Sequence, residues 1–176
     1  MSDTPYLGQT MDIVLGQEFL TWLWFRSESR NGIFMTAGGT NFSIYMEQRI
    51  VVQGGEGESL ETATVSGPMS QLREARLGLM TGKKVSRALL RIERDADNWQ
   101  VTLKAEDFAL GSLKTPAIEK GDSEGDDPDA RFLEKMYLIE TCLNLIDEVY
   151  RQFLTVRLSS KWSEEVQDLR IWMEKN

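Results

Sequence analysis

The feature that most constrains the fold is a long amphipathic stretch in the C-terminal third of the chain. Its apolar residues follow one another at alternating steps of four and three, which is a heptad pattern and predicts one long helix. Asp127 is expected to cap this helix, and Pro128 suits its first position, where a missing N–H costs nothing. The heptad residues are Phe132, Met136, Ile139, Leu143, Ile146, Tyr150 and Phe153.

A second row of apolar residues runs beside the heptad pattern, so the apolar face is wider than a two-stranded coiled coil requires. We therefore expect the helix to lie against a sheet and its surplus face to meet either the last helix or a second subunit. A homodimer through the C-terminal helices is predicted on this ground. The second row holds Leu138, Cys142, Leu145, Val149 and Val156, and the last helix has its own row of Trp162, Val166, Leu169 and Met173.

The N-terminal two thirds predict one helix followed by strands. The run from Leu15 to Ser27 is apolar on a wide face and contains Trp22 and Trp24, which favours a core helix over an aromatic partner site. Turn residues at Asn31-Gly32 and glycine pairs then separate segments with the two-residue period of strands. The expected segments are strands within 33–54, a strand at 61–67, a short helix at 69–80 and an antiparallel pair at 84–93 and 98–105.

The fold class that follows is α+β, an antiparallel sheet packed with helices. Residues 1–118 are expected to form the sheet domain, and residues 130–176 to form C-terminal helices that pack on the same domain. Between them, residues 119–129 hold six acidic groups and one basic group, together with glycines, which is typical of a solvated linker.

Several classes of chemistry are excluded or disfavoured by residue content. The chain has no histidine, which removes Ser-His-Asp and Cys-His nucleophilic sites and every metal set that includes histidine. Its single cysteine, Cys142, cannot form an internal disulfide or a zinc site, and its apolar surroundings predict a buried, inert thiol. Neither the glycines around Gly78–Lys84 nor the acidic run from Asp122 has the spacing of a phosphate loop or a calcium loop. We therefore expect a non-enzymatic protein without catalytic residues, metal or cofactor.

The distribution of charge is uneven. The chain has a formal net charge of −8, which argues against a basic coat over the whole surface. Residues 71–94 nevertheless hold seven basic and two acidic residues. The two-residue period of a strand predicts one face shared by Lys83, Val85, Arg87, Leu89 and Arg91, with about 13 Å between successive charges.

This basic row has two interpretations. A row of cations at that spacing suits a phosphate backbone, with Lys83, Lys84, Arg87 and Arg91 in contact with DNA and Arg73 and Arg76 assisting. Alternatively, it is a solvated strand face whose arginines pair with Glu93, Asp95 or the acidic linker. Composition alone leaves both open.

Three segments together resemble the recombination-associated protein RdgC family, over about Leu15 to Leu158. They are EFLTWLWFRSE near the start, TGKKVSRALLRIE with the following strand and FALGSLKTP, and DPDARFLEKMYLIETCLNLIDEVYRQFLTVRL near the end. Family members are longer, with an additional N-terminal half, so we expect this sequence to correspond to the C-terminal portion.

The resemblance implies a cytoplasmic, nucleoid-associated protein that binds double-stranded DNA without sequence preference. It further implies dimerisation into a ring around the duplex and limited access of the RecA recombinase to DNA. A cytoplasmic location is also expected because the opening MSDTPYLGQT lacks the features of a signal peptide. The alternative function is a non-catalytic protein-interaction module that does not bind DNA.

Overall fold

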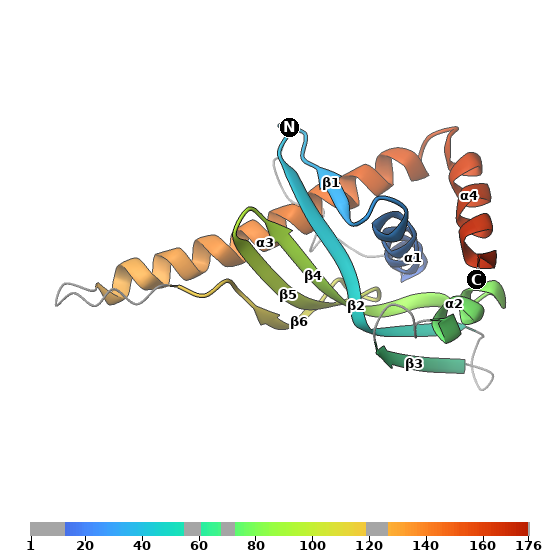
Figure 1. The fold of residues 1–176 in the computed structure, drawn as a ribbon, viewed down its shortest axis with the longest axis horizontal. Coiled ribbons are helices and arrows are strands. Elements are labelled where there is room, and N and C mark those ends of the chain that lie inside the picture. Colours follow the sequence, from blue (N-terminus) through green and yellow to red (C-terminus); the bar gives the residue numbers. More distant parts are fainter. Residues whose placement is uncertain (1–12, 55–60, 68–72, 119–126, 176) are drawn as a thin grey trace.

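In the computed structural model, residues 13–54, 61–67, 73–118 and 127–175 are described, and they form an antiparallel sheet with helices against one face (Figure 1). The fold is α+β, as predicted. The helices are α1 (Ile13–Ser29), α2 (Arg73–Met80), α3 (Pro128–Arg157) and α4 (Trp162–Glu174). The strands are β1 (Ile33–Met35), β2 (Asn41–Gly54), β3 (Glu61–Gly67), β4 (Lys84–Arg94), β5 (Asp97–Lys104) and β6 (Leu110–Lys114).

The described strands form one open sheet of six, in which all pairs are antiparallel. The path runs β1-β2-β4-β5-β6, and β3 lies beside the C-terminal part of β2. Asn31 and Gly32 both adopt positive φ between α1 and β1, and Asp95 does so between β4 and β5. These turns confirm the sequence-based turn predictions, because Asn, Asp and Gly tolerate the left-handed region.

The core lies between the inner face of the sheet and helices α1 and α3. Alternate strand residues such as Ile44, Leu90 and Val101 point into it and are fully buried. Trp22 and Trp24 of α1 are 1% and 0% exposed, so the prediction of a core helix is confirmed. At Gly16, α1 approaches the sheet so closely that an added Cβ would collide with the Ala105 carbonyl oxygen.

Helix α3 has one end on the sheet and one end beyond it. Asp127 caps it as predicted, because its Oδ1 accepts a hydrogen bond from the Asp129 backbone N–H at 3.0 Å. The buried residues of α3 begin at Leu138, whose carbonyl accepts from Trp99 Nε1 at 2.9 Å. Residues 128–137 extend past the strands (Figure 1).

The heptad pattern of α3 is consequently divided between two environments. Ile146, Tyr150 and Phe153 are buried in the core of this same chain, whereas Phe132 and Met136 are exposed. The predicted surplus face therefore does not run the length of α3. Only its N-terminal part is uncovered, because the sheet ends before the helix does.

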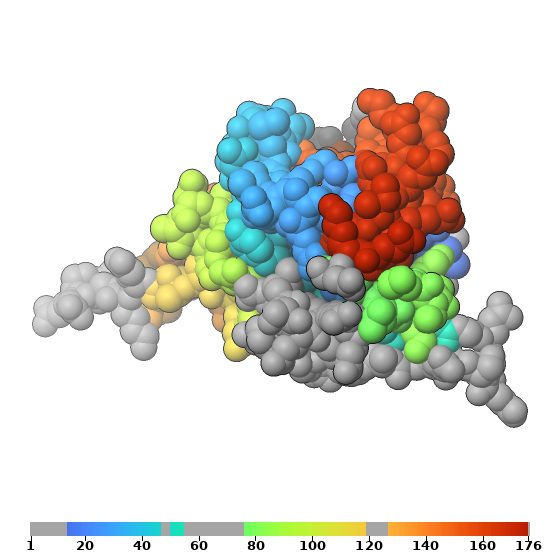
Figure 2. All heavy atoms as spheres, turned by 45° about the vertical axis from the view of Figure 1, so that its right-hand side comes forward, coloured from blue at the N-terminus to red at the C-terminus, as the bar shows by residue number. Residues whose placement is uncertain are grey.

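Helix α4 packs against α1 and α2 (Figure 2), and two partly buried carboxylates hold it there. Glu165 Oε2 accepts hydrogen bonds from Trp22 Nε1 and Arg26 Nε, both at 3.0 Å. Glu28 accepts from Trp24 Nε1 at 3.0 Å and from Trp172 Nε1 at 2.6 Å, and it forms an ion pair with Arg76. Arg76 also stacks over the Trp172 ring at 4.8 Å.

Two features of the sheet differ from the prediction. Gly38-Gly39 separates two strands as predicted, but the second, Asn41–Gly54, is one long strand of 14 residues instead of a short one, and Leu110–Lys114 adds an edge strand that the periodicity did not indicate. Among the described residues, no helix is long and apolar enough to span a bilayer.

Candidate nucleic-acid interface

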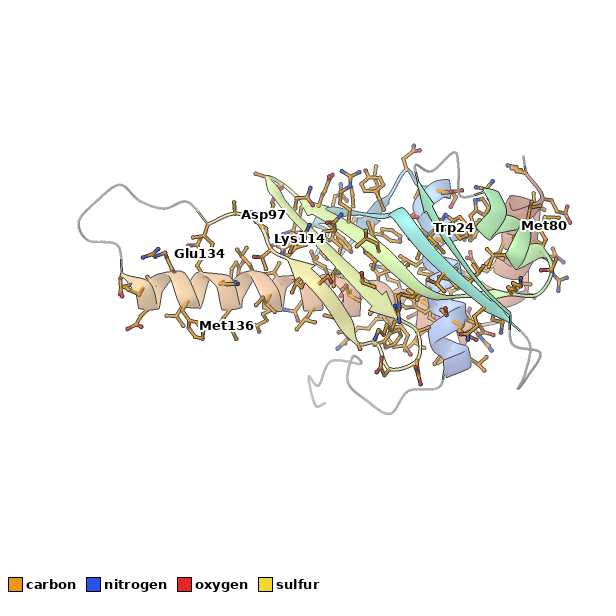
Figure 3. The ribbon with its side chains drawn as sticks, turned by 90° about the horizontal axis from the view of Figure 1, so that it is seen from below. Trp24, Met80, Asp97, Lys114, Glu134 and Met136 are labelled. Atoms are coloured by element: carbon orange, nitrogen blue, oxygen red, sulfur yellow. The ribbon has the colours of Figure 1, made fainter. Side chains whose placement is uncertain are left out.

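None of the described helices covers the sheet face opposite α1 and α3, and Figure 3 looks onto this open face, with Lys114 labelled. The residues that point to this face alternate with the buried residues of β4 and β5 and are half-buried or exposed. On the described strands they include Tyr45, Arg87, Leu89, Arg91, Glu93, Gln100, Thr102, Lys104 and Lys114. Four of these nine are basic and one is acidic, so the open face is locally positive although the chain is acidic.

A β-bulge at Ser86 decides which basic residues reach this face. Val85 pairs with Val52 and Arg87 with Val51, so Ser86 is an extra residue in β4. Val85 consequently points inward, with 0% exposure, and its N–H donates to Thr21 Oγ1 of α1 at 3.1 Å. The prediction that Val85 shares a face with Arg87 is wrong, because a bulge shifts the alternation of side chains by one residue.

Arg87 and Lys104 are directly opposite each other on β4 and β5. Opposed residues in an antiparallel pair have Cβ atoms about 5 Å apart and point to the same face, so two like charges there destabilise the sheet slightly. Within the part of the chain that the structure describes, neither cation has a carboxylate partner. Together with Leu89, Thr102, Gly111 and Ser112 they line a hollow of about 240 Å³.

A second row of polar side chains crosses the sheet one step further along. Arg91 is opposite both Tyr45 on β2 and Gln100 on β5, and Gln100 is opposite Lys114 on β6. Arg91 stacks over the Tyr45 ring at 4.6 Å and forms an ion pair with Glu93. The pairing with Glu93 matches the solvated-face interpretation for this residue, whereas Arg87 has no such partner among the described residues.

The other predicted contact residues lie elsewhere. Lys84 Nζ is 3.8 Å from Glu18 Oε1 of α1, and Lys83 and Lys84 both line an apolar groove beside α4. Arg76 is engaged with Glu28 and Trp172, and its Nη1 also donates to the Lys175 carbonyl at 3.0 Å. Arg73 begins α2, and its side chain is outside the described part. Of the six predicted residues, only Arg87 and Arg91 are placed on the open face.

Lys104 and Lys114 were missed by sequence reasoning because they stand alone in the sequence and only the strand register brings them to Arg87 and Arg91. Lys104 follows Gln100 and Thr102 at the two-residue spacing of a strand, so the sequence indicated that it shares their face of β5. For Lys114 no comparable signal existed, because β6 itself was not predicted.

The chain matches no protein-family model, no curated protein and no solved structure. The resemblance to the RdgC family therefore stays a prediction.

The described residues contain no group of three or more His, Cys, Asp or Glu side chains that could hold a metal ion.

Proposed function

We propose that this protein binds double-stranded DNA through the open face of its sheet, without sequence preference. Arg87 and Lys104 form the centre of the contact, and Arg91 and Lys114 extend it across β4, β5 and β6. The observation that carries the proposal is the opposed pair of Arg87 and Lys104, which has no described carboxylate partner and lines a hollow on a face that no described helix covers. A phosphate placed there would offset the repulsion between the two cations.

The spacing of the cations suits a polyanion better than a small anion. Arg87 and Arg91 are separated by about 13 Å along β4, whereas Arg91 and Lys114 are separated by two strand spacings, or about 10 Å. Contacts of this kind neutralise phosphates and do not read base edges, so unrelated duplexes should bind alike. By the RdgC resemblance, the proposal extends to recombination, where a protein that covers duplex DNA limits the access of RecA.

The salt dependence of DNA binding tests the proposal. Each neutralised phosphate contributes about −0.9 to the slope of log K against log salt, so four contacts per protomer give a slope of about −3.6. The double variant Arg87→Gln, Lys104→Gln should make the slope less steep by about 1.8. It should also weaken binding equally on two unrelated duplexes. Fluorescence anisotropy of labelled duplexes at several salt concentrations measures both quantities.

The matched control removes the same amount of positive charge elsewhere. Lys161 and Arg170 are exposed on the α3–α4 turn and on α4, and their double Gln variant should bind DNA with a slope close to that of the wild type. Equal losses in the two variants would mean that only the net charge of the protein matters. A wild type with no DNA affinity at low salt would remove the proposal.

A second candidate function is a protein-interaction module that does not bind DNA. It is favoured by the large exposed apolar side chains at the N-terminal end of α3, which include Phe132 and Leu133 at 64% and 66% exposure. The anisotropy titration separates the two candidates. The second function predicts that the wild type has no DNA affinity and that Arg87→Gln therefore does not change DNA binding.

A further inference from the structure

The N-terminal end of α3 presents an apolar surface that the described part of the chain does not cover. We call residues 128–137 the α3 tip. Its exposed apolar residues are Phe132 at 64%, Leu133 at 66%, Met136 at 48% and Tyr137 at 61%. Figure 3 shows Met136 on the part of α3 that extends beyond the sheet.

The geometry of the helix gathers these four side chains on one side. Phe132 and Met136 are one turn apart and form one row, and Leu133 and Tyr137 form the adjacent row. Ile139 and Leu143, both half-buried, continue the first row toward the sheet. Four large apolar side chains within two turns form a contiguous patch, and patches of this kind mark interaction sites.

We propose that the α3 tip is a self-association surface, occupied by the α3 tip of a second copy packed antiparallel to it. The apolar pattern is symmetric about the midpoint between Glu134 and Lys135. A two-fold axis there places Phe132 of one copy opposite Tyr137 of the other, and Leu133 opposite Met136. Such a contact is isologous and closes at two subunits.

The charges of the α3 tip also suit a second copy of this acidic chain. Asp129 and Glu134 are balanced by Arg131 and Lys135, so residues 128–137 have no net charge although the whole chain carries −8. The tip is therefore a place where two copies meet with little local repulsion. The remaining repulsion between two acidic molecules is screened by salt, so dimerisation should strengthen as salt is raised.

The area available agrees with a reversible dimer. Large apolar side chains of about 200 Å² each, roughly 60% exposed, give on the order of 1,000 Å² when four from each copy are buried. That is near the lower limit of about 1,000 Å² for a specific interface. Ile139 and Leu143 add to it, and we expect dissociation constants in the micromolar range.

Sedimentation velocity of the full chain across a range of micromolar concentrations tests the surface. The wild type should dimerise, and Met136→Glu should weaken self-association by about 30-fold or more, since it acts twice in a symmetric contact. The control is Leu158→Glu, at a position that is 80% exposed and outside the tip, and it should dimerise as the wild type does. Thermal melting verifies that both variants are folded.

Two results would overturn the proposal. A wild type that stays monomeric at high micromolar concentration, at low and at raised salt, would exclude a second copy as the occupant. A Met136→Glu variant that dimerises as tightly as the wild type would place the dimer contact on another surface. Neither result depends on DNA, so the proposal stands or falls separately from the proposed function.

The antiparallel arrangement has its own measurement. A spin label on Asn144→Cys should lie about 30 Å from its copy in the dimer, from a rise of 1.5 Å per residue about the midpoint and an interaxial distance of about 9 Å. A parallel pair would give about 10 Å and would contradict the arrangement. Cys142 does not interfere, because it is buried and its burial raises the pKa of its thiol to about 12.

Discussion

Glu28 joins three side chains from three helices and shows how single residues determine the position of α4. Its carboxylate accepts hydrogen bonds from the indole N–H groups of Trp24 and Trp172 and pairs with Arg76. Both members of the ion pair are mostly shielded, with side-chain exposures of 21% for Arg76 and 17% for Glu28. Arg76 therefore belongs to the edge of the core, although it lies in the basic stretch of residues 71–94.

We predict that Glu28→Ala lowers the free energy of unfolding by about 2 to 4 kcal/mol. Removing the carboxylate leaves the Arg76 guanidinium and two indole N–H groups without their acceptor in a shielded environment. Urea unfolding followed by tryptophan fluorescence measures the change. The control Glu106→Ala removes an exposed carboxylate and should change the free energy of unfolding by less than about 0.5 kcal/mol. Equal stability of the two variants would contradict the role assigned to Glu28.

The bulge in β4 determines which side chains point into the core and which point to the open sheet face. Ser86 is the extra residue, and it lets Val85 point inward while Arg87 points outward. If Ser86 were paired regularly in β4, residues 85 and 87 would share a face, because side chains alternate with a period of two. One of them would then be in the wrong environment.

Deleting Ser86 makes Val85 and Arg87 neighbours in β4, so both keep their faces, and it should cost only about 1 to 3 kcal/mol in free energy of unfolding. The cost comes from the Ser86 carbonyl, which accepts a hydrogen bond from the buried Ala105 backbone N–H at 2.8 Å. The comparison variant Ser86→Ala keeps the residue count and loses only the 3.3 Å hydrogen bond to the Val51 carbonyl, so it should cost less than about 1.5 kcal/mol. Urea unfolding of both variants gives the two values, and a loss above about 4 kcal/mol on deletion would contradict this geometry, because it would mean that Val85 or Arg87 had changed face.

The elements with strong local signals were predictable from the sequence, and those that depend on tertiary context were not. The helix from Pro128 follows from its cap and apolar spacing, and the β4–β5 pair from alternation around a turn. The edge strand β6 is short, contains Gly111, and has Ser112 at positive φ, so it lacks the alternation that marks a strand. The bulge at Ser86 has no local signature, and the candidate site was therefore only half predicted.

At the scale of the whole molecule, charge and apolar surface are segregated. The open sheet face gathers cations although the chain carries −8, which keeps the repulsive charge away from the proposed DNA contact. The apolar α3 tip lies beyond the sheet, so it can associate without covering that face. The two proposals therefore assign separate surfaces, and their salt dependences have opposite signs, because DNA binding weakens with salt and contact between acidic copies strengthens.

The separation of the two surfaces leads to a prediction that links them. A dimer carries two open sheet faces, and if both engage one duplex the slope of log K against log salt should approach twice the single-face value of about −3.6. The monomeric variant Met136→Glu keeps all four cations of each face, so its slope should fall to roughly half that of the dimeric wild type, with weaker binding at every salt concentration. Anisotropy titrations on one long duplex, with the wild type above its dimer dissociation constant, make the comparison, and Leu158→Glu again serves as the control. Identical slopes for Met136→Glu and a demonstrably dimeric wild type would mean that each face binds DNA alone, because a second face that adds phosphate contacts must release additional counterions.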